Sequence, residues 1–100
     1  LKAQGHLEEA ITCYNQTLSR QPDHAEAHNN LGNALKDLGR LEEAISAYRQ
    51  ALKIRPAYPE AYNNLGVALR QQGQWQAAMT AYQQAIGLRP NYFEAHQNLG

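Results

Sequence analysis

The chain has 100 residues, the size of one small domain, and its nine basic and nine acidic side chains give a net charge of +0 at pH 7. This balance gives no electrostatic reason to expect nucleic acid or an anionic membrane as a partner. No apolar run approaches the roughly 20 residues that a membrane span requires. Cys13 is the only cysteine, which excludes an internal disulfide and fits a reducing compartment such as the cytoplasm.

The sequence repeats itself. AEAHNNLGNAL begins at Ala25, PEAYNNLGVAL begins at Pro59, and FEAHQNLG begins at Phe93, so the interval is 34 residues each time (59 − 25 and 93 − 59). We therefore interpret residues 1–100 as a single repeat array, with part-units at 1–24 and 93–100 and full units at 25–58 and 59–92. Because the chain starts and stops within this pattern, we expect it to be a piece of a longer protein.

Each unit is predicted to form two antiparallel helices, which makes the fold all-α. Between residues 25 and 38 the apolar residues recur at steps of three and four, and a second such stripe runs from Leu41 to Leu52. Gly39 suits a left-handed helix stop, and Pro56 lies just past the second helix. Capping-box spacing predicts that the first helices start at Asp23 and Asn91.

The next unit repeats this plan, with a helix stop at Gly73 and Pro59 in the first turn of its first helix. We expect the recurring tyrosines and Trp75 to lie in the core. Cys13 aligns with alanines, which predicts a small buried residue. Gly32 and Gly66 fall in mid-helix, where glycine costs about 0.5–1 kcal/mol relative to alanine. We expect close approach to the facing alanine of the paired helix, Ala44 or Ala78, to offset that cost.

These spacings resemble the tetratricopeptide repeat across the entire chain. The residues that carry the resemblance in the two full units are Leu31, Gly32, Leu35, Gly39, Ala44, Tyr48, Ala51 and Pro56, and Leu65, Gly66, Leu69, Gly73, Ala78, Tyr82, Ala85 and Pro90. The resemblance implies a right-handed superhelical solenoid of helix pairs, with the first helices lining its concave side.

Polar residues of the first helices fall on one face and recur in consecutive units. Stacking the units predicts three ladders on the concave side, formed by glutamates, by asparagines and by basic residues. Their members are Glu26, Glu60 and Glu94; Asn30, Asn64 and Asn98; and Lys2, Lys36 and Arg70, with Asn29, Asn33 and Asn63 beside them. An asparagine carboxamide both donates and accepts hydrogen bonds, so this ladder suits the backbone of an extended peptide.

The asparagine ladder closely resembles the repeat array of O-linked N-acetylglucosamine transferases. That resemblance implies that Asn30, Asn64 and Asn98 hold a peptide backbone, as the substrate arm of a larger enzyme. The 100 residues hold no paired carboxylates, phosphate loop or catalytic triad with the spacing of an enzyme, so we predict a protein- or peptide-binding scaffold without catalysis, cofactor or metal. His24 and His28 have metal-ligand spacing, but aromatic rings occupy the aligned positions and no third ligand is evident.

Other functions remain open at this stage. The two-carboxylate clamp of repeat domains that bind chaperone tails uses Lys, Asn, Asn, Lys and Arg. The aligned positions here hold no cation; they are Asn29, Asn33, Asn64, Glu94 and Asn98. A structural scaffold is the main alternative, working through convex or end-to-end contacts, since the two part-units nearly complete one unit head to tail. A regulatory arm of an enzyme is the third.

Overall fold

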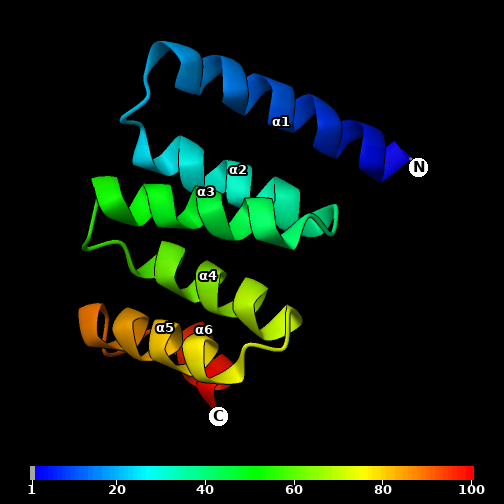
Figure 1. Cartoon of the computed structure of the whole chain (residues 1–100). Helices are drawn as coiled ribbons and strands as arrows, with labels where there is room; N and C mark the ends of the chain where they lie inside the picture. The colour runs from blue at the N-terminus through cyan, green and yellow to red at the C-terminus, as the bar shows by residue number, and fades with distance from the viewer. Residues whose placement is uncertain (1) are drawn as a thin grey trace.

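The computed structural model describes residues 2–100, with side chains from Gly5 onward, and all regular secondary structure in that range is helical. The helices follow one another along the molecule (Figure 1). They are α1 (Lys2–Arg20), α2 (Ala25–Asp37), α3 (Leu41–Ile54), α4 (Pro59–Gln71), α5 (Trp75–Leu88) and α6 (Phe93–Leu99). The predicted all-α class is confirmed.

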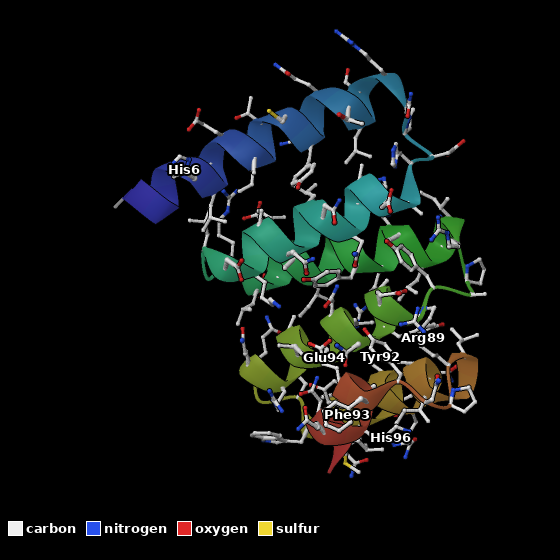
Figure 2. The ribbon with its side chains drawn as sticks, turned by 180° about the vertical axis from the view of Figure 1, so that it is seen from behind. His6, Arg89, Tyr92, Phe93, Glu94 and His96 are labelled. Carbon is white, nitrogen blue, oxygen red and sulfur yellow. The ribbon has the colours of Figure 1, made fainter. Side chains whose placement is uncertain are left out.

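Consecutive helices pack in pairs, and the pairs stack. The most extensive contacts join α2 to α3 and α4 to α5, while α1 packs on α2, α3 on α4 and α5 on α6. The first helices of successive pairs also touch, α2 with α4 and α4 with α6. In Figure 2, which shows the molecule from behind, α6 lies in front of α5. This arrangement confirms the predicted solenoid of helix pairs.

The turns inside the two complete pairs depend on glycine in a left-handed conformation. Gly39 and Gly73 both have a φ of 83°. The Arg40 N–H donates to the Leu35 carbonyl at 2.9 Å, and the Gly39 N–H donates to the Lys36 carbonyl at 2.9 Å, the two hydrogen bonds of a Schellman stop. Gly5 aligns with these glycines but lies inside α1.

The predicted helix starts at Asp23 and Asn91 are wrong. The N-cap of α2 is His24, whose ring Nδ1 accepts a hydrogen bond from the Ala27 N–H at 3.1 Å. The N-cap of α6 is Tyr92, which makes no side-chain capping bond. The chain enters each of these helices one residue later than the capping box requires, so the aspartate and asparagine stay exposed. Pro59, by contrast, occupies the first turn of α4 as predicted.

The mid-helix glycines make room for a tyrosine ring, which is their nearest neighbour in place of the expected alanine. A Cβ atom at Gly66 would lie 2.5 Å from Cε1 of Tyr82, and one at Gly32 would lie 2.6 Å from Cε1 of Tyr48. Both tyrosines are essentially fully buried, at 0% and 2% exposure. The ring of the second helix thus lies flat over the backbone of the first, and only a hydrogen atom fits between them.

The two tyrosine hydroxyls differ in their partners. The Tyr48 hydroxyl donates to Oδ1 of Asn33 at 2.6 Å. Burial, and secondarily the Asp37 carboxylate, raise the pKa of Tyr48 well above its usual range. Val67 stands where Asn33 does in the preceding unit. The Tyr82 hydroxyl is therefore buried without a hydrogen-bond partner among the described residues.

Residues near the two ends of the array are more exposed than the repeat pattern predicts. Trp75 is 62% exposed and Cys13 is exposed, so both expectations of burial are wrong. Among the described helices α1 packs only on α2, whereas α3 lies between α2 and α4 and buries the alanine that aligns with Cys13. Similarly, α6 has 7 residues against 13 in α4, and so covers less of α5.

A membrane crossing needs a long, strongly apolar helix, and none of the described helices meets that requirement.

Gly66→Ala should destabilise the protein, although alanine is the better helix former. The added methyl group overlaps the Tyr82 ring, and overpacking of this kind costs about 1–3 kcal/mol. Thermal unfolding followed by circular dichroism should show a melting temperature lower by about 4–8 °C per kcal/mol. The matched control is Gly87→Ala in α5, where nothing lies within 4 Å and a gain of up to about 1 kcal/mol is expected. Equal shifts in both variants would contradict the packing argument.

Removing the two buried hydroxyls should have opposite effects. Tyr48→Phe loses a hydrogen bond and should cost about 0.5–1.5 kcal/mol in the free energy of unfolding. Tyr82→Phe removes a buried hydroxyl that has no partner and should be neutral or stabilise by about 1 kcal/mol. Urea unfolding of both variants measures the difference, and Val67→Asn should abolish it by giving Tyr82 an acceptor.

Candidate peptide-binding surface

The three asparagines of the predicted ladder occupy the same position in α2, α4 and α6. Asn30, Asn64 and Asn98 are each half-buried. At 3.6 residues per turn, Asn30 falls on the side of α2 that also carries Glu26 and Asn33. We call the surface formed by these positions of α2, α4 and α6 the first-helix face.

Asn29 and Asn63, which precede the ladder residues Asn30 and Asn64, are buried and do not lie on the surface where they were expected. Asn29 is 6% exposed and Asn63 is 1% exposed, so neither carboxamide is available for direct contact with a ligand. The prediction that they belong to the ligand-contacting surface is therefore corrected. Each lies one residue, or about 100°, further round the helix, which turns it toward the next pair of helices instead of toward solvent.

The buried asparagines are hydrogen-bonded to the ladder across the boundary between units. Nδ2 of Asn64 donates to Oδ1 of Asn29 at 3.0 Å, and Nδ2 of Asn98 donates to Oδ1 of Asn63 at 3.0 Å. A primary amide has two N–H donors and an oxygen that accepts. Asn64 and Asn98 thus each use one N–H in these bonds, and their other N–H and Oδ1 have no hydrogen-bond partner among the described residues.

The acidic and basic candidates differ in their surroundings. Glu26 is exposed, whereas Glu60 is ion-paired with Arg89, which lies at the end of the following helix. Burial raises the pKa of Glu60, but hydrogen bonds from Arg89 and the backbone, together with the positive charges of Arg89 and Arg55, outweigh burial and hold the pKa below its usual value. Lys36 and Arg70 are both half-buried near the carboxyl ends of α2 and α4. Among the basic candidates, Lys2 lies outside the residues whose side chains are described.

Two arginine–tyrosine pairs next to the site were missed from the sequence. The Arg55 guanidinium lies 4.4 Å from the centre of the Tyr58 ring, and that of Arg89 lies 4.7 Å from the centre of the Tyr92 ring. Arg89 and Tyr92 are neighbours in Figure 2. Their signal in the sequence is the pair RPAY and RPNY, 34 residues apart.

The histidines with metal-ligand spacing have structural contacts instead. His24 caps α2, and Nε2 of His28 lies 3.0 Å from the carbonyl oxygen of Pro22. His96, which aligns with His28, makes the same contact with Pro90 at 2.7 Å. Each ring therefore fastens the turn that enters its helix. Within the described residues there is no cluster of three or more histidine, cysteine, aspartate or glutamate side chains that could hold a metal ion.

Two similar grooves lie on the other side of the first helices. One, of about 330 Å³, runs between α1 and α3 over His28, Leu31 and Leu35 of α2. The other, of about 360 Å³, runs between α3 and α5 over the aligned residues of α4, which are Tyr62, Leu65 and Leu69. These floor residues fall opposite Glu26, Asn30 and Asn33 on the helix, so the grooves are separate from the first-helix face.

Solved structures share the fold over nearly the whole chain. The first helix-repeat domain of Spaghetti (RPAP3), described as bound to the HSP90 peptide SRMEEVD, is 29% identical with a TM-score of 0.92, over 96% of this chain and 76% of that one. A MamA RS-1 double mutant is 27% identical with a TM-score of 0.86, over 95% of this chain and about half (53%) of that one. The comparison with curated protein sequences returned no match.

Family profiles cover the same range. A profile described as "TPR repeat" matches residues 1–39 and 32–72, and one described as "Tetratricopeptide repeat" matches residues 59–92. With the stacked helix pairs, the glycine turns and the buried tyrosines, these matches show that the chain belongs to the tetratricopeptide repeat family.

Proposed function

We propose that the first-helix face holds the main chain of an extended peptide or protein segment, with Asn30, Asn64 and Asn98 as its contacts. The observation that carries this proposal is the repetition of one half-exposed carboxamide in α2, α4 and α6, with Oδ1 and at least one N–H left for a ligand. The likeness to a repeat domain described as bound to a peptide supports it.

The spacing of the rungs suits an extended chain. Helices packed side by side lie roughly 10 Å apart, and an extended peptide advances roughly 3.3 Å per residue, so a rung meets about every third residue. Three rungs span about six or seven residues. Each neutral hydrogen bond contributes about 0.5–1.5 kcal/mol, and association first costs several kcal/mol of lost freedom. Binding by these residues alone is therefore weak and tolerant of the peptide's sequence.

The charges of the face favour an uncharged main chain over an acidic tail. Glu94 is exposed and would repel a carboxylate, while Asn29, at another position where a two-carboxylate clamp has lysine, is buried. Lys36 and Arg70 flank the ladder and offer further donors to peptide carbonyl groups. On this proposal the chain is a scaffold that binds the backbone amides of a peptide. It forms part of the substrate arm of a larger transferase.

Replacing the ladder should abolish peptide capture without unfolding the array. The triple variant Asn30→Ala, Asn64→Ala and Asn98→Ala should lose the amide shifts seen when a blocked Ala/Ser/Thr peptide of about nine residues, long enough for three rungs, is titrated into ¹⁵N-labelled protein. Far-UV circular dichroism should stay helical. The matched control is Asn15→Ala, an exposed asparagine of α1 away from the face, which should bind as the parent does. Undiminished binding by the triple variant would reject the ladder.

End-to-end association is the second candidate. Four large apolar side chains of α5 and α6 are exposed: Trp75 at 62%, Met79 at 47%, Leu88 at 42% and Phe93 at 71%. Burying them against the α1 end of another copy gives a head-to-tail contact that does not close on itself. Sedimentation velocity across a concentration series should then show growing species, and Trp75→Gln with Phe93→Gln should suppress them. A strict monomer into the millimolar range rejects this candidate.

A further inference from the structure

A chain of side-chain contacts joins each turn between units to one rung of the ladder. At the second boundary Arg89 is ion-paired with Glu60 and stacks on Tyr92. Burial raises the pKa of Tyr92, and a hydrogen-bonding contact with the Asn63 amide opposes that increase. Asn63 in turn accepts a hydrogen bond from Asn98 at 3.0 Å. Asn63 is 1% exposed, so the acceptor of this bond is buried.

The first boundary repeats the arrangement. Arg55 stacks on Tyr58, whose pKa is raised by burial and lowered in part by contact with Asn29. Asn29 accepts from Asn64 at 3.0 Å. Asn30 makes no equivalent hydrogen bond among the described residues. Two ladder asparagines, Asn64 and Asn98, are therefore hydrogen-bonded to a buried asparagine, and Asn30 serves as the comparison without that bond.

The orientation in which a carboxamide is fixed determines where it presents its donor and its acceptor to a ligand. With Asn63 in its buried position, turning the Asn98 amide over would place its oxygen against Oδ1 of Asn63 and leave two acceptors facing each other. An unsatisfied buried polar group costs about 1–3 kcal/mol, so the reversed orientation is suppressed about fivefold to a hundredfold or more. Oδ1 and the second N–H of Asn98 therefore keep fixed places on the first-helix face.

We propose that Asn29 and Asn63 are positioning residues, each of which locks the ladder carboxamide of the next unit in one orientation and so makes the face select one direction of the bound peptide. The inference rests on the proposed function. In an extended peptide the N–H and C=O of one residue exchange places when the chain runs the other way. A rung free to turn over accepts both directions, whereas a locked rung accepts one.

The lock is tested first in the protein without peptide. In side-chain ¹⁵N–¹H spectra, one amide proton of Asn64 and of Asn98 should be shifted downfield and exchange slowly with solvent, relative to those of Asn30. Asn63→Leu, similar in size but without an acceptor, should shift the Asn98 pair toward Asn30 values and leave Asn64 unchanged. Asn63→Asp keeps an acceptor oxygen and should retain the Asn98 signature. Unchanged Asn98 signals in Asn63→Leu overturn the proposal.

Peptide binding supplies the second readout. Asn63→Leu should weaken binding of the blocked Ala/Ser/Thr peptide about threefold to tenfold, the equivalent of one lost hydrogen bond, and Asn63→Asp should restore it. A nitroxide at one end of the peptide should broaden signals of either α2 or α6 in the parent, and of both in the variant carrying Asn29→Leu and Asn63→Leu. Asn29→Leu, read out at Asn64, replaces Asn63→Leu if that variant unfolds.

The two proposals fail differently. A parent protein that binds no peptide, with the Asn64 and Asn98 signatures present, rejects the proposed function and leaves the lock established as a structural feature. A parent that binds the peptide equally in both directions, or variants that bind equally well with the lock removed, reject the positioning role and leave the ladder in place. Circular dichroism of every variant confirms that the helices persist.

Discussion

The close contact between a glycine and a tyrosine ring is the constraint on which the array depends. Gly32 under Tyr48 and Gly66 under Tyr82 set how near the two helices of a pair can come, since a single methyl group would already overlap the ring. That spacing allows the second helix to bury its alanines against the first. Because each pair has the same separation, the first helices follow one another in register, and residues at equal positions line up along one face.

The features predicted correctly from the sequence are those that depend on the backbone conformation at a single residue. The helix stops at Gly39 and Gly73 follow from the conformational freedom of glycine, and the start at Pro59 follows from a ring that already has helical φ. The capping boxes failed because His24 and Tyr92 compete for the same place, one residue later in the chain. A capping pattern alone does not rank two residues that can each precede the helix.

The predictions for the site show a second limit. The stripe of asparagines was visible from their spacing, but Asn29 differs from Asn30 only by 100° around the helix. Whether a side chain at that angle meets solvent or a neighbouring helix depends on α4, because Asn29 is bonded to Asn64, 35 residues away in the sequence. The pairing of Glu60 with Arg89 is equally non-local. Repetition at 34 residues identifies which positions are equivalent, while contacts between units decide what each of them touches.

The bond from Asn64 to Asn29 has an offset one residue longer than the repeat itself. Copying a 34-residue unit in tandem therefore produces both halves of the junction at once, the acceptor in the old copy and the donor in the new one. A gene that lengthens or shortens such an array by whole units needs no compensating mutation at the seam. Growth in steps of one unit is thus chemically self-consistent, and the first-helix face lengthens with it.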